Sequence, residues 1–146
     1  MIPTITSLFE RDLNKLIEEI NLYKNEDDFW KIKEGISNSG GNLTLHLIGN
    51  LNHFIGATLG NTGYIRERDK EFSLKNIPRV QLVEDLKNTN EVIKNTLALL
   101  LQEDLKKDFP IPINDKTSST SFVLIYMLAH FNYHLGQVNY HRRLIG

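Results

Sequence analysis

All five histidines of the chain, the residues best suited to bind a metal ion here, fall in two segments. His46 and His53 lie seven residues apart, and His130, His134 and His141 follow near the C-terminus. On an α-helix, the spacing of His130 and His134 places them one turn apart, with Cβ atoms about 6 Å from each other, so both imidazoles can reach one ion. A third ligand would have to come from the other segment.

Apolar residues surround these histidines, so the same pattern also fits a hydrophobic core. The neighbours of His46 and of the His130–His134 pair are large and apolar: Leu43, Leu47, Ile48, Leu51, Phe54 and Ile55 in one segment, and Leu124, Met127, Leu128, Phe131, Leu135 and Val138 in the other. Buried imidazoles need partners, and a shared metal ion would satisfy several of them together. Periodicity alone leaves metal ligands and hydrogen-bonded core histidines as open alternatives.

Apolar residues recur with helical period in four segments of the chain, and no stretch alternates long enough to predict a strand. The predicted helices cover residues 4–24, 41–59, 79–103 and the stretch from the end of "TSST" (117–120) to 144. Asn38 and Ser39 provide capping side chains for the second of these. The sequence therefore predicts an all-α protein, a four-helix bundle that forms a single domain over residues 1–146.

The connection over residues 60–78 is far longer than an antiparallel turn requires. A crossover of this length can run back along a bundle and leave the second and third helices parallel. Its polar residues Tyr64, Arg66, Arg68 and Asp69 can reach over a substrate or a neighbouring subunit, or brace the loop through their own ion pairs, and the second interpretation is favoured. The loop starts roughly 20 Å along the helix from His46, which argues against a catalytic role unless the loop folds back.

The composition excludes several classes of protein. The chain has no cysteine, which rules out disulfides, thiolate zinc sites and cysteine nucleophiles. Its net charge of −1, with both signs interspersed, makes nucleic acid an improbable partner. No apolar run is long enough for a membrane helix, and the N-terminus lacks the pattern of a secretory signal. We therefore expect a cytoplasmic protein without a membrane or nucleic-acid partner.

Two stretches make the sequence resemble the DinB-like superfamily, and more narrowly a branch of bacterial DinB-like metal-binding proteins. They are "GNLTLHLIGNLNHFIGATLGNTGYIRERDKEF" (41–72) and "AHFNYHLGQVNYHRRL" (129–144). The resemblance covers essentially the whole chain. It implies a four-helix bundle of up-down-down-up topology, and a homodimer, since related bundles often pair.

The resemblance also implies a divalent metal ion, most often zinc or nickel, held by one residue of the second helix and a histidine pair of the fourth. The matching positions here are His46, His130 and His134, whereas His53 and His141 fall outside that triad. Three imidazoles leave a coordination position open, as in catalytic sites. The implied activity is that of a metal-dependent thiol S-transferase, with a small thiol and an electrophile as substrates, and hydrolysis as a variant. A non-catalytic bundle that binds a metal or a small ligand is the alternative.

Two amides near the predicted ligands have more than one interpretation. Asn50, one turn after His46, can hydrogen-bond a ligand or substrate, or it can tie two helices together as a buried amide. Gln137, three residues after His134, can orient a ligand histidine, or it can simply pack beside Gly136, which is favoured. No catalytic residue is identified outside the metal site.

Overall fold

The computed structural model describes residues 1–145, and Gly146, the last residue of the predicted domain, lies outside this range. Within it the chain is all-α, as predicted, and its only β-pairing is two isolated bridges in the connection before the last helix, Asp108 with Ser119 and Ile113 with Lys116. Its helices are α1 (Ile2–Leu22), α2 (Gly40–Leu51), α3 (Thr58–Gly60), α4 (Arg68–Ser73), α5 (Arg79–Ala98) and α6 (Thr120–Ile145).

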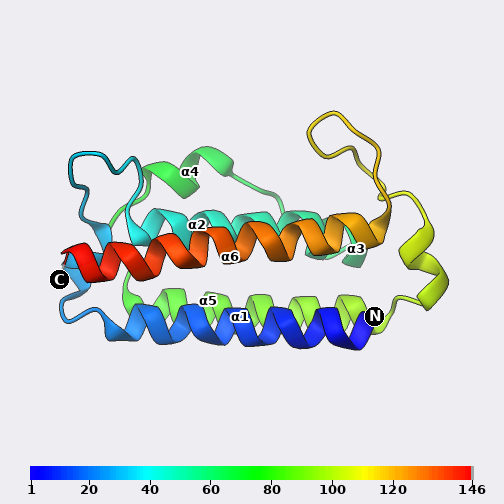
Figure 1. Cartoon of the computed structure of the whole chain (residues 1–146), viewed down its shortest axis with the longest axis horizontal. Helices are drawn as coiled ribbons and strands as arrows, with labels where there is room; N and C mark the ends of the chain where they lie inside the picture. Colours follow the sequence, from blue (N-terminus) through cyan, green and yellow to red (C-terminus); the bar gives the residue numbers. More distant parts are fainter. Residues whose placement is uncertain (146) are drawn as a thin grey trace.

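The long helices lie side by side (Figure 1). Helix α1 packs against α5 and α6, and α2 packs against the same two helices. Figure 1 shows α2 and α5 running in one direction while α1 and α6 run in the other. The long crossover between α2 and α5 makes this arrangement geometrically accessible.

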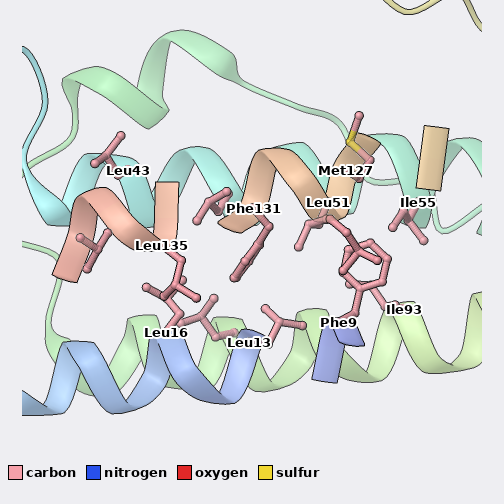
Figure 2. Close-up of a cluster of buried hydrophobic side chains, with 14 of the residues drawn as sticks. Phe9, Leu13, Leu16, Leu43, Leu51, Ile55, Ile93, Met127, Phe131 and Leu135 are labelled. Carbon is pink, nitrogen blue, oxygen red and sulfur yellow. The ribbon is translucent and has the colours of Figure 1, made fainter. Parts of the chain in front are cut away.

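The hydrophobic core fills the space between these helices (Figure 2). Each helix contributes fully buried side chains to it: Phe9, Leu13 and Leu16 from α1, Leu47 and Leu51 from α2, Leu82, Leu86 and Ile93 from α5, and Leu124, Phe131 and Val138 from α6. Burying such side chains stabilises the fold by about 1.5–3 kcal/mol each. The core fixes how α2 and α6 face each other, and these two helices carry the predicted ligands.

The second predicted helix, 41–59, is present, but its hydrogen bonding changes along its length. Ser39 caps its start, since the hydroxyl accepts a hydrogen bond from the Asn42 N–H at 3.1 Å. After α2, a π-helical turn over Asn52–Ala57 leads into α3. Asn61 ends the helical rod in a left-handed conformation with φ of 50°.

The third predicted helix is shorter than expected. Helix α5 ends at Ala98 rather than at 103, and a short 3₁₀ helix, Gln102–Lys106, follows it. The carboxylate of Asp104 accepts a hydrogen bond from the Leu101 N–H at 2.8 Å. Asp104 therefore caps the start of a new turn. The backbone leaves the α-helix before this point, although the apolar period of the sequence continues past it.

The crossover between α2 and α5 folds back along α2, where its short helix α4 packs. The buried Asn42 holds it there, because its side-chain amide donates hydrogen bonds to the carbonyls of Glu71 and Leu74, both at 2.9 Å. The tip of the predicted crossover thus returns to the first turns of α2, where His46 lies.

A search of the described helices for a membrane span finds none that combines the required length and apolarity.

Candidate metal centre

Three histidines from two helices converge at one point of the structure. The Nε2 atom of His130 lies 3.2 Å from that of His46 and 3.1 Å from that of His134. One ring nitrogen from each of the three lies within 4.8 Å of the others. His46 is buried in α2, and His130 and His134, one turn apart on α6, are half-buried.

A hydrogen bond at Nδ1, the ring nitrogen that faces away from the triad, fixes the orientation of the His46 ring. Its Nδ1 lies 3.0 Å from Oε1 of Glu71, and a carboxylate oxygen only accepts, so Nδ1 carries the proton and Nε2 presents its lone pair. Arg66 binds the same carboxylate through Nε at 2.8 Å and Nη2 at 3.0 Å. Burial raises the pKa of Glu71, but the hydrogen bonds with His46 and Arg66 outweigh this and hold it below its ordinary value.

A second contact orients His134. Its Nδ1 lies 2.7 Å from the side-chain oxygen of Gln137. This assigns the proton to Nδ1 and leaves Nε2 as an acceptor. The contact agrees with the interpretation of Gln137 as an orienting residue rather than the favoured one of packing beside Gly136.

His130 lies between the other two rings and stays uncharged. Burial, together with the neighbouring His134, His46 and Arg66, lowers the pKa of His130 to about 4. Its buried Nδ1 has no hydrogen-bond partner among the described residues. At neutral pH His130 is therefore a neutral imidazole, which is the protonation state that binds metal ions.

The geometry fits a divalent metal ion. With a metal–nitrogen distance of about 2.0–2.1 Å, two ligands at a tetrahedral angle lie about 3.3–3.4 Å apart. This is close to the Nε2–Nε2 distances from His130 to His46 and to His134. A carboxylate behind a ligand histidine, as Glu71 lies behind His46, is the usual outer partner in such sites. The histidine triad could therefore hold a metal ion.

Comparison with known protein families assigns the chain. A family model described as "Protein of unknown function (DUF1572)" matches residues 5–146. The chain belongs to the DUF1572 family. No curated protein matches its sequence significantly.

In this DUF1572 protein, Asn50 lies next to the histidine triad and His53 lies outside it. Asn50 is buried and lines a cavity beside His46 and His130, and its Oδ1 has no hydrogen-bond partner within residues 1–145. His53 lies in the π-helical turn, outside the triad. The family assignment by itself gives none of these residues a role, so their roles depend on the geometry.

His141, also outside the triad, joins the end of α6 to other segments. It is buried, its Nδ1 lies 2.7 Å from the Tyr23 hydroxyl, and its Nε2 lies 2.8 Å from the carbonyl oxygen of Lys31. Burial lowers the pKa of His141, and this outweighs the opposite effects of the Lys31 carbonyl and Asp28. These contacts describe a structural histidine.

We expect His141 to make stability depend on pH. Because its folded-state pKa is lowered, the stabilisation from neutral His141 is complete above its ordinary pKa of about 6.5 and is lost as pH falls through the folded value. His141→Gln should lower the free energy of unfolding by about 1–3 kcal/mol at pH 7.5, and by progressively less toward pH 5. Urea unfolding of both proteins across this range measures the gap. A gap that stays constant with pH would contradict this assignment.

Glu71 is a residue of the site that the sequence did not indicate, and Arg66 lies closer to the histidines than its loop position suggested. The 60–78 loop does brace itself through ion pairs, since Arg66 pairs with Glu71 within it. It also folds back, the exception to the distance argument, and brings the Arg66 guanidinium to 3.4 Å from His46 Nδ1. One feature of the sequence, the glycine at position 49, is consistent with this close approach. Gly49 lies inside α2, where a Cβ would overlap the Glu71 carboxylate and come within 2.6 Å of its Cδ. A glycine in mid-helix often marks such a close approach.

Adding this Cβ should disturb the site. Gly49→Ala should displace Glu71 from His46, destabilise the fold by about 1–3 kcal/mol and weaken zinc binding about tenfold. Gly136→Ala is the matched control, because a Cβ there meets no atom within 4 Å. It should raise stability by about 0.5–1 kcal/mol through helix propensity. Thermal unfolding and zinc titration of both variants test this, and similar behaviour of the two would contradict it.

Proposed function

We propose that this chain is a divalent-metal-dependent enzyme of the DinB-like superfamily, built as a four-helix bundle of up-down-down-up topology. One observation carries the proposal: three imidazoles direct Nε2 toward one point, and Glu71 and Gln137 bind the opposite nitrogens of His46 and His134. Without a metal, a proton on His130 Nε2 could bind the lone pair of only one of its two neighbours well, whereas a shared metal ion satisfies all three nitrogens. The crossover that returns to α2 supports the topology.

The metal proposed at the triad is zinc or nickel, both of which imidazole ligands suit. When bound, such an ion lowers the pKa of a ligated thiol or water and so supplies a nucleophile at neutral pH. His46, His130 and His134 would hold it, which leaves at least one coordination position for a substrate. Glu71 keeps the proton on His46 Nδ1, and Arg66 keeps Glu71 charged.

The proposed reaction is thiol S-transfer. A small thiol gives its proton to solvent, its sulfur forms a bond to an electrophilic carbon, and the leaving group departs with the electron pair of the broken bond. The absence of cysteine from the chain means that the sulfur nucleophile comes from a substrate. The second substrate is a small electrophile, and the proposal includes a homodimer as the assembled form.

An activity assay tests this proposal. Protein loaded with zinc or nickel is incubated with a panel of thiols and a chloro-dinitroarene, and product is followed by absorbance. We expect a metal-dependent rate with at least one thiol, which His130→Ala removes. Equal rates with and without protein for every thiol would contradict the proposed reaction. A protein that binds the metal but shows no rate would be the non-catalytic alternative.

A further inference from the structure

A cavity of about 360 Å³ opens directly beside the histidine triad. Its wall includes His46 and His130, together with the polar side chains of Asn50, Arg66 and Arg68. At about 30 Å³ per water molecule, the volume corresponds to about a dozen waters, so it suits a small metabolite rather than a peptide or a nucleic acid. Its position next to the triad lets an occupant reach the metal site.

The cavity favours an anion. Two guanidinium groups line it, from Arg66 and Arg68, and none of its described lining residues carries a carboxylate. The guanidinium of Arg66 already forms an ion pair with the Glu71 carboxylate. Arg68 lies over the ring of Phe72, with 5.7 Å from Cζ to the ring centroid, and within residues 1–145 it forms no ion pair. A guanidinium with free donors is suited to a carboxylate, which it can bind through two parallel hydrogen bonds.

The side chain of Asn50 sets a second requirement for a ligand of this cavity, a hydrogen-bond donor. Only 6% of this residue is exposed, and its Oδ1 is a buried acceptor for which the described part of the chain offers no partner. Leaving such an oxygen unpaired costs free energy, and native proteins rarely do so without a reason. A ligand that carries an N–H or O–H group would supply the missing donor.

From these observations we infer that the cavity binds a small organic acid, whose anionic group pairs with Arg68 and whose N–H or O–H group donates to Asn50 Oδ1. The inference rests on the proposed function in one respect, since it makes the thiol substrate such an acid, with its sulfur at the triad. Arg68 and Asn50 are then the residues that select the substrate by its charge and by its donor group.

Three related thiols separate the two contacts. N-acetylcysteine carries both groups, N-acetylcysteinamide replaces the carboxylate by a neutral amide, and 3-mercaptopropionate lacks the N–H. In calorimetric titrations of zinc-loaded protein, we expect loss of the carboxylate to weaken binding about tenfold. Arg68→Gln should remove that difference. Arg143→Gln should keep it, because Arg143 also lies over an aromatic ring, that of Tyr140, but does not line the cavity.

The N–H contact is tested with Asn50→Leu, which keeps the approximate size of the side chain. In the wild type, N-acetylcysteine should bind more tightly than 3-mercaptopropionate, by a few-fold to tenfold, and this difference should vanish in the variant. The melting temperature should stay equal or rise, because an unpaired buried acceptor is removed. A large fall in melting temperature with the difference retained would show a structural amide and overturn this contact.

The experiment distinguishes failure of this inference from failure of the proposed function. If zinc binds and the acid and its amide bind equally well to the wild type, the inference is overturned while the metal site stands. If zinc does not bind, the proposed function fails. The cavity is then tested on the protein as purified, by ligand-observed NMR with N-acetylalanine and N-acetylalaninamide. A preference for the acid that Arg68→Gln removes supports the inference, and equal binding overturns it.

Discussion

His130→Ala should abolish high-affinity metal binding, with zinc affinity falling by more than the 10–100-fold typical of losing an outer partner of a ligand. Its Nε2 lies between those of His46 and His134, 3.2 Å and 3.1 Å away, so its loss removes the nitrogen that both of the others approach. Two imidazoles would remain, without a third protein ligand to complete the site.

Thermal shift measures this result independently of activity. A ligand present at 100 times its Kd stabilises the folded protein by about 2.7 kcal/mol, so zinc should raise the melting temperature of the wild type and leave that of His130→Ala unchanged. His53→Ala is the control, because His53 lies outside the triad on the same helical rod as His46. Equal zinc stabilisation of wild type and His130→Ala would contradict the proposed ligand set.

Glu71→Gln should weaken zinc binding by about 10–100-fold, the range typical for outer partners of a ligand histidine. A neutral amide can still accept the proton of His46 Nδ1, but it does not make the imidazole as good a ligand as a carboxylate does. The substitution also leaves the guanidinium of Arg66 opposite a neutral group, and its side chain is only 13% exposed. Breaking a buried ion pair by removing one partner costs about 3–5 kcal/mol, and partial exposure of Arg66 should place the loss below that range.

Glu67→Gln provides the matched control for this substitution. Glu67 lies on the same crossover and pairs with Lys70 at 2.8 Å, but both side chains are well exposed. Surface pairs of this kind are worth about 0–1 kcal/mol, so this variant should keep both its stability and its zinc affinity. If the two variants bind zinc equally well, the Glu71 carboxylate has no role in the metal site.

The sequence predicts the histidine triad because helical periodicity converts spacing into direction. The separation of His130 and His134 fixes their common face on any α-helix, and the resemblance adds His46 from the other helix. The same periodicity failed at the end of α5, where the side chain of Asp104 caps a new turn. Periodicity reports which face is apolar, and it does not report where local hydrogen bonds end a helix.

Glu71 could not be found in this way, because the position of a crossover is a tertiary property. The distance along the helix argued against a role for the loop unless it folds back, and the sequence alone does not show whether it does. Asn42 reverses that path by binding the carbonyls of Glu71 and Leu74. Gly49 is the position on α2 that admits the returning carboxylate, but a single glycine does not identify which side chain it faces.

Elemental analysis of the protein purified without a histidine tag shows whether His46, His130 and His134 hold one divalent metal ion. This ligand set requires about one zinc or nickel ion per chain, and His46→Ala purified in the same way should contain almost none. Wild-type protein without a stoichiometric divalent ion, whose uptake of added zinc or nickel is unchanged by His46→Ala, would contradict it.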